Sequence, residues 1–230
     1  MVKKGEPFFF WMALVLIAIV VSGFSLLAFS RPGGPLETPL FLHFHGAVFL
    51  GWFVLLAVQA RLIGAGKAPL HKRLGQASLA LAVAIVIVGY LVVRFAVHKP
   101  DMTIAGRPAI IGAVFPIWDV INFTIAYTLG LANRSNAGAH KRFMLCAAIL
   151  MIDPAMARLV FGLGLPGILI LVAELSLFLA LIVYDLIARR RPHWASLVGL
   201  GLYAAAMAFK LNIENFTWWP DFVKALFGLG

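Results

Sequence analysis

Residues 8–29, FFFWMALVLIAIVVSGFSLLAF, form a run of apolar and small residues without a single charged side chain. About 20 consecutive apolar residues are enough for a helix to cross the hydrocarbon core of a bilayer. The run follows MVKKGEP, as the apolar part of a signal peptide would, but it is too long and lacks a small-x-small cleavage site. We therefore expect an uncleaved membrane-spanning helix here.

The composition of the whole chain is that of a membrane protein. Of the 230 residues, 63% are hydrophobic and 12% are charged, and the mean hydropathy is +0.99, whereas a soluble domain carries about 25% charged residues. Similar apolar runs recur along the chain, separated by short connections marked by Pro, Gly or Asn. We expect seven spans, at residues 8–29, 40–61, 71–97, 108–131, 140–162, 166–188 and 195–213.

The expected fold is an all-α polytopic membrane protein, a seven-helix bundle in one domain over residues 1–230. The tail 214–230 is too short and too interrupted to span, and Trp218 and Trp219 suit an anchor at the membrane surface. Cys146 lies inside an apolar run, so cysteine usage indicates no redox compartment.

The net charge of +10 is best explained by membrane topology. Three cations lie in the first, third and fifth loops: Arg31, Lys99 and Arg107. Twelve lie in the N-terminus and in the second, fourth and sixth loops, namely Lys3, Lys4, Arg61, Lys67, Lys72, Arg73, Arg134, Lys141, Arg142, Arg189, Arg190 and Arg191. Cytoplasmic loops carry the excess of Lys and Arg. We expect the N-terminus inside, the C-terminus outside and no nucleic-acid partner.

A histidine with two cations opens two of the expected spans. The stretches are APLHKRLG at 68–75 and AHKRFM at 139–144, and RPHW at 191–194 is a looser copy. Cations at a helix N-terminus lose about 0.3–1 kcal/mol to the helix dipole, a cost that disappears if an anion binds there.

A haem b is one group that fits this pattern. Its iron takes two imidazoles, for which we expect His71 and His140, and its propionates favour nearby cations, here Lys72, Arg73, Lys141 and Arg142. Anionic lipid explains the cations equally well but gives the histidines no special role.

The motifs HKRLG and HKRFM, with FLHFHG upstream at 41–46, resemble those of a group of bacterial multi-span membrane proteins of unknown function. More distantly, residues 40–190 are similar to haem-binding helical domains of the cytochrome b561 type. The resemblance implies one haem b on His71 and His140, a bacterial inner (plasma) membrane, and a membrane electron donor or acceptor such as a quinone. A second haem is not implied, because the fourth expected span contains no histidine.

A second set of polar residues lies toward the outer side of the expected spans. His45, Trp52 and Gln59 recur every seven residues and would form one stripe, so we expect His45, rather than His43, to face the bundle. Asp119, Asp153 and Glu174 lie well inside spans, where an acidic residue costs about 2.5–3.5 kcal/mol and usually marks a site. We expect Asp185 to pair with the neighbouring run Arg189–Arg191.

Two prolines favour a cavity at these acids. Pro116 precedes Asp119 and Pro154 follows Asp153, and proline bends a helix and frees a carbonyl. His45, Asp119, Asp153 and Glu174 could hold Zn, Fe or Mn, or the acids could relay protons. The bland alternative is a set of buried ion pairs with Arg158 or Lys210.

The sequence thus favours a membrane redox or electron-transfer protein with a b-type haem near the cytoplasmic face. The alternatives are a transporter or metal-dependent membrane enzyme that uses the outer set, and an assembly or accessory subunit without chemistry of its own. HExxH and CxxC are missing from the chain, and no GxGxxG pattern follows an expected strand, so no enzyme class is indicated.

Overall fold

The computed structural model describes residues 7–30 and 34–229, so Lys3, Lys4 and Arg31 lie outside the described residues. Within this part of the chain the protein is all-α apart from one short hairpin, and six helices or helix pairs are long and apolar enough to cross a membrane. These are α1 (Pro7–Ser30), α2 (Leu40–Gly64), α3 (Ala68–Val97), α4 (Ala109–Gly112) with α5 (Val114–Ala132), α8 (Ile168–Arg189) and α9 (Trp194–Leu211).

The remaining span is broken. Helix α6 (Ala137–Ile149) and helix α7 (Asp153–Gly162) meet at an angle of 43° across residues 150–152, and together they bring the candidate spans to seven. Pro154 lies in the first turn of α7 and has no N–H, so it cannot bond the carbonyl of Leu150 and continue α6. The expected proline bend is therefore a complete interruption of the helix.

The connections and the tail contain shorter elements. A 3-10 turn, η1 (Gly34–Glu37), precedes α2, and an antiparallel hairpin of β1 (Thr103–Ile104) and β2 (Arg107–Pro108) precedes α4. After η2 (Ile213–Asn215), helix α10 (Trp219–Phe227) packs against α4. The expected interfacial role fits Trp218, which is half exposed, but Trp219 is buried and donates from Nε1 to the carbonyl of Ile110 at 3.1 Å.

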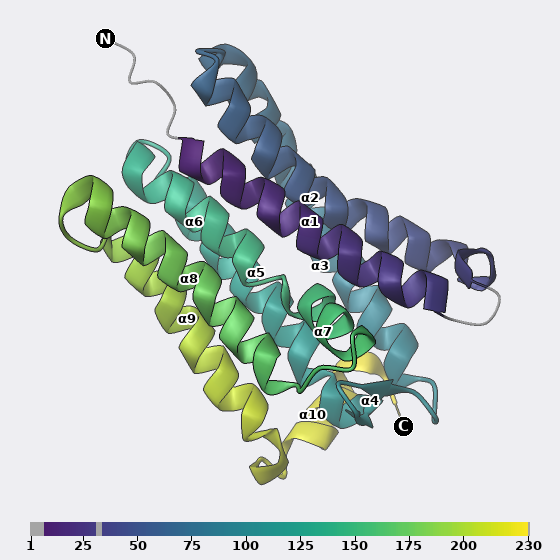
Figure 1. Ribbon diagram of the computed structural model, residues 1–230. Coiled ribbons are helices and arrows are strands. Elements are labelled where there is room, and N and C mark those ends of the chain that lie inside the picture. Colours follow the sequence, from purple (N-terminus) through teal and green to yellow (C-terminus); the bar gives the residue numbers. More distant parts are fainter. Residues whose placement is uncertain (1–6, 31–33, 230) are drawn as a thin grey trace.

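Figure 1 shows the long helices lying side by side, with their connections gathered at two opposite ends. The start of α1 and the α2–α3, α5–α6 and α8–α9 turns lie at one end, and the β-hairpin, the α7–α8 loop and α10 lie at the other. This is the arrangement expected for seven passes through one bilayer.

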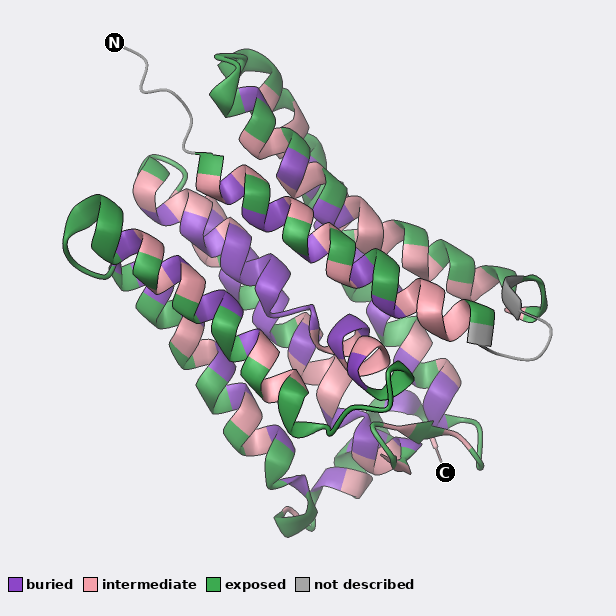
Figure 2. Ribbon diagram, in the orientation of Figure 1, coloured by how far each residue is buried: buried purple, intermediate pink, exposed green. Residues whose placement is uncertain are grey.

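Buried residues line the inside of the bundle and exposed residues cover its outside (Figure 2). The outer surface is itself apolar: Trp11, Phe29 and Ile187 are 62%, 76% and 74% exposed. Such a surface is stable against lipid tails, so the protein is integral to a membrane and its helices contact the bilayer.

Helix α6 and the break that follows it form much of the interior. Residues Leu145–Ile152 of α6 and the break are all buried, and α1 packs along α7. The approach of α1 is close enough that a Cβ added at Gly23 would overlap the carbonyl oxygen of Ala155. Glycine is thus needed at this crossing, as small residues are at many contacts between membrane helices.

Candidate functional site

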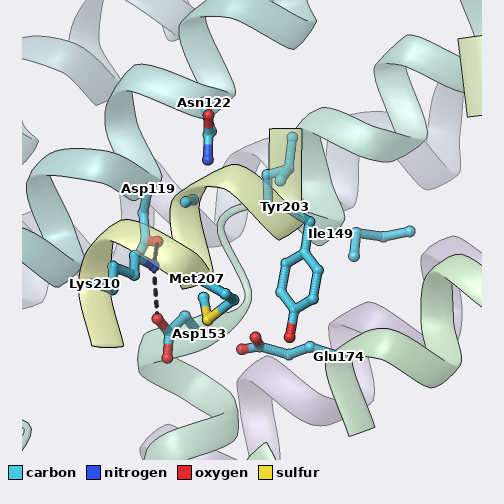
Figure 3. A pocket seen from close by; sticks show the side chains of 10 residues that line it. Asp119, Asn122, Ile149, Asp153, Glu174, Tyr203, Met207 and Lys210 are labelled. Atoms are coloured by element: carbon cyan, nitrogen blue, oxygen red, sulfur yellow. Dashed lines mark hydrogen bonds and ion pairs between the residues drawn. The ribbon is translucent and has the colours of Figure 1, made fainter. Parts of the chain in front are cut away.

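A lysine ammonium lies between two aspartates inside the bundle. Lys210, in the last turn of α9, donates from Nζ to Oδ1 of Asp119 on α5 at 2.5 Å and to Oδ2 of Asp153 at 2.8 Å (Figure 3). The Lys210 side chain is only 1% exposed. The pairing joins α5, α7 and α9.

The break between α6 and α7 positions one of these carboxylates. Asp153 is the first residue of α7, directly before Pro154, and therefore lies where the helical path changes direction. Asp119 lies one turn after Pro116, which occupies the first turn of α5, where proline is tolerated. The cost of burying the three charges is offset because each has an oppositely charged partner.

Two further side chains complete this cluster. Glu174 on α8 is 2% exposed, and its carboxyl lies beside the hydroxyl of Tyr203 on α9 (Figure 3), which donates to the carbonyl of Leu171 at 3.3 Å. Among the described residues, Oε1 of Glu174 and Oδ2 of Asp119 are buried without a hydrogen-bond partner. We call Asp119, Asp153, Glu174, Tyr203 and Lys210 the Lys210 cluster.

A small cavity lies within the Lys210 cluster. The volume of this cavity is about 10 Å³, which is about the room that one water molecule needs. Figure 3 shows the carboxylates and Lys210 converging on this space from different helices. Asn122, Ile149, Leu150, Ala206 and Met207 complete its lining.

The expected outer set is only partly assembled. Asp119, Asp153 and Glu174 line one cavity, but His45 is not among its lining residues. His45 is half-buried on α2 with its ring 4.4 Å from that of Phe49, while His43 is exposed, which agrees with the helical phase. Among the described residues, no group of three His, Cys, Asp or Glu side chains could hold a metal ion, and the Lys210 ammonium lies between the two aspartates.

The alternative of buried ion pairs with Lys210 agrees with the structure, whereas Tyr203 and Asn122 were not expected at the site. Tyr203 lies seven residues before Lys210, two turns away on the same face of α9, and Asn122 is one turn beyond Asp119, so helical spacing could have indicated both. Arg158, considered as a partner for Asp153, instead donates from Nη1 to the carbonyl of Pro154 at 2.6 Å and lies over the ring of Phe24.

The two histidines of the HKR triplets meet at the other end of the bundle. The ring centroids of His71 on α3 and His140 on α6 are 6.3 Å apart and the rings are perpendicular. Nδ1 of His140 is 2.8 Å from the carbonyl oxygen of Gly130, a contact that leaves Nε2 available as a ligand. Nδ1 of His71 is buried without a partner among the described residues. We call these two residues the histidine pair.

The cations beside the histidine pair have different surroundings. Lys72 and Arg73 are exposed, and Lys141 lies over the ring of Phe9. Arg142 is buried: its Nε donates to Oδ1 of Asp185 at 2.8 Å and its Nη1 donates to the carbonyl of Gly138 at 2.8 Å. The charge of Arg142 is thus compensated within the protein.

Asp185 was expected to pair with the run Arg189–Arg191, and that prediction is wrong. Besides binding Arg142, its carboxylate accepts from the hydroxyl of Ser196 at 2.6 Å and from the backbone N–H of His193 at 3.0 Å. Asp185 binds Arg142 on α6 instead of Arg189 on its own helix, because a buried carboxylate needs several hydrogen-bond donors at once. Asp185 thus places an anion beside the starts of α6 and α9, where the helix dipoles favour negative charge.

His193 caps the start of helix α9. Its Nδ1 accepts from the backbone N–H of Ala195 at 3.1 Å, so the ring is neutral in this contact. Burial, together with the charges of Arg142 and Arg189, lowers the pKa of His193 to about 4.

Comparisons with protein-family models, with curated proteins and with solved structures found no match to this chain.

Proposed function

We propose that the protein is a proton-coupled membrane transporter and that the Lys210 cluster is its working site. The observation that carries the proposal is the Lys210 ammonium, buried inside the membrane-spanning bundle and shared by carboxylates of two other helices. Ionisable residues inside a membrane are costly, and they commonly mark substrate or proton pathways.

The broken helix favours a transport role for the Lys210 cluster over a purely structural role. Interrupted helices whose ends line a site inside the membrane recur in secondary transporters. Here the break at 150–152 ends at Asp153, and Leu150 lines the cavity. The contact between Asp153 and Lys210 holds α7 to α9, so a change in the charge of the cluster that weakens this contact would couple proton binding to the angle between α6 and α7.

Currents on a solid-supported membrane would test this proposal without knowledge of the transported solute. Proton binding to a site inside the membrane moves charge through part of the bilayer, so a step in external pH should give a transient current in proteoliposomes. We expect Asp119→Asn to reduce the current several-fold. Asp221→Asn, a change at an exposed residue of α10, should leave it unchanged. A wild-type response equal to that of empty liposomes would reject the proposal.

A second candidate function, electron transfer through a haem b, is favoured by the histidine pair. A metal held by two imidazoles lies about 2 Å from each nitrogen, and centroids 6.3 Å apart suit two rings that approach a common metal. The donor set fits haem, although Arg142 is already bound to Asp185, so Lys72 and Arg73 remain for the propionates. Haem would supply one-electron chemistry, with a membrane quinone as the partner.

A visible spectrum tests this second candidate. Protein from haem-replete cells should show a sharp Soret band, and reduction with dithionite should resolve its α and β bands. His71→Ala and His140→Ala should abolish these bands, whereas His193→Ala should retain them, because His193 binds Ala195 N–H and not the pair. A colourless wild-type protein would reject the haem.

The identity of the membrane also belongs to the proposal. The excess of Lys and Arg in alternate loops fits a membrane whose inner side is cytoplasmic. We propose the bacterial plasma membrane, which sustains the proton gradient that a proton-coupled transporter needs.

A further inference from the structure

We infer that Glu174 is a neutral carboxylic acid at neutral pH and carries the exchangeable proton of the Lys210 cluster, while Asp119 and Asp153 remain ionised against Lys210. The transport role of this proton rests on the proposed function, but its presence on Glu174 does not. The ion that the site exchanges is thus a proton, and the residue that binds it is distinct from the residues that fix the helices.

The surroundings of the Glu174 carboxyl provide the first argument. Glu174 is 2% exposed, and its Oε1 has no hydrogen-bond partner among the described residues. The hydroxyl of Tyr203 lies beside the carboxyl (Figure 3), but it donates to the carbonyl of Leu171 at 3.3 Å. A tyrosine hydroxyl has one hydrogen, so in this arrangement Tyr203 does not donate to an ionised Glu174.

The charge balance of the cavity provides the second argument. Among the described residues that line it, three carboxylates face one ammonium, which would leave two negative charges uncompensated if all were ionised. Lys210 bonds Asp119 and Asp153 directly, and Glu174 has neither a cation nor a backbone N–H as partner among the described residues. A buried carboxyl without such a partner takes up a proton instead of remaining charged.

The groups that face Glu174 come from each helix packed around it. They are Asp119 on α5, Asp153 on α7, and Tyr203 and Lys210 on α9. Arg158 on α7 is held by the carbonyl of Pro154 and by Phe24. The two aspartates repel an ionised Glu174, while Lys210 attracts it but is shared between them. Glu174 is therefore the carboxyl whose ionisation is least compensated.

The cavity offers a route for exchange. Oε1 of Glu174 is free of protein partners in the described structure, and the adjoining space has room for about one water molecule. When the O–H bond of Glu174 breaks, the proton passes to that water and the electron pair stays on the carboxylate. The new negative charge then competes with Asp153 for Lys210, at the helix break.

Infrared spectroscopy of the protein in liposomes would test the inference directly. A protonated carboxylic acid has a carbonyl stretch apart from the amide and carboxylate bands, and the stretch shifts in D₂O. At pH 7 we expect one such band from the buried acids in the wild type, lost in Glu174→Gln and retained in Asp119→Asn. Glu214→Gln, at a glutamate paired with Arg107 on the surface, is the matched control and should retain it.

A second variant keeps the test decisive if Glu174→Gln fails to fold. Tyr203→Phe removes the hydroxyl that lies beside the Glu174 carboxyl, so the carboxyl loses a polar neighbour and the band should shift to higher frequency while the helix content stays the same. Absence of the band from the wild type at pH 7, or no response to either folded variant, would overturn the inference. A band without a pH-step current would reject transport alone, and a current without the band would reject only the role of Glu174.

Discussion

The ammonium of Lys210 holds two carboxylates, and its removal leaves both without a partner. We predict that Lys210→Met lowers the stability of the detergent-solubilised protein by about 3–5 kcal/mol, the usual cost of stranding a buried charge. Thermal unfolding followed by circular dichroism measures this loss. Lys224→Met, at a surface lysine paired with Asp221 one turn away, should change the stability by less than about 0.5 kcal/mol.

Thermal unfolding also measures how much each aspartate contributes to the stability of the cluster. Asp153→Asn should be milder than Lys210→Met, because Lys210 keeps its bond to Asp119. Adding Asp119→Asn to Lys210→Met should recover part of the loss, since one stranded carboxylate is neutralised. If Lys210→Met unfolded at the wild-type temperature, the ion pairs of the cluster would not exist as described.

His193 makes a distinct prediction about pH. In the unfolded chain a histidine has a pKa near 6.5, whereas His193 in the folded protein has a pKa of about 4. Between these values the unfolded state binds more protons, so stability rises with pH there. The contribution of the neutral His193 is full above about pH 6.5 and is lost as the pH falls toward 4.

This predicts that the wild-type unfolding temperature falls when the pH is lowered from 7 to 5. His193→Asn should reduce that fall, because asparagine can still accept from the N–H of Ala195 but does not titrate. Unfolding curves of both proteins at the two pH values measure the difference. Equal pH slopes in the two proteins would mean that His193 is not the residue responsible.

At the residue level, the cost of a buried charge is visible in the sequence, whereas the choice among its distant partners is not. Lys210 was named only as one of two possible ion-pair partners of the acids, and in the structure it binds Asp119 and Asp153. Asp119, Asp153 and Glu174 were identified because a lone acid in an apolar run is expensive. The pairing of Asp185 with Arg142 was missed, because 43 residues separate them and only the packing of α6 on α8 brings them together. The functional roles proposed for the cluster and for the histidine pair remain predictions.

At the scale of helices, the sequence located the spans well because apolar length is a local property. Pro154 also indicated a bend, but whether a proline bends a helix or ends it depends on what receives the freed carbonyls, which is a tertiary question. The packing of α10 on α4 was not foreseen either. The tail was expected to anchor at the surface, yet Trp219, Val223 and Phe227 are buried.

The crossing of α1 and α7 gives a test of helix packing. We predict that Gly23→Ala destabilises the protein by about 1–3 kcal/mol, because the added methyl group would overlap the backbone of Ala155 and push α1 away from α7. Gly46→Ala, in the interior of α2 with nothing within 4 Å of its added Cβ, should instead be neutral or stabilising by up to about 1 kcal/mol. Thermal unfolding of both variants compares them.

Because α7 begins at Asp153, the same substitution should disturb the Lys210 cluster if α1 supports the angle of the break. A smaller pH-step current in a folded Gly23→Ala protein would be that effect. If Gly23→Ala and Gly46→Ala unfolded at the same temperature, the close approach of α1 to α7 would be wrong.

For the whole molecule, the described basic loops coincide with one end of the bundle. The α2–α3, α5–α6 and α8–α9 turns gather there (Figure 1) and contain Lys67, Arg134 and Arg190. The Lys210 cluster lies nearer the opposite end, because Lys210 is in the last turn of α9 and Glu174 is in the second turn of α8. The orientation of the bundle therefore decides which compartment the cluster faces.

The final prediction is this orientation. Twelve cations against three in the alternating loops favour a cytoplasmic N-terminus, so reporter fusions in the loop 62–70 should be cytoplasmic and fusions in the loop 98–107 should be outside. A fusion at the C-terminus serves as the control for seven passes and should also report outside. The reverse pattern would turn the Lys210 cluster toward the cytoplasm. With the predicted orientation, right-side-out proteoliposomes should give the pH-step current when the external pH changes, since the shorter path from Glu174 to water leads outward.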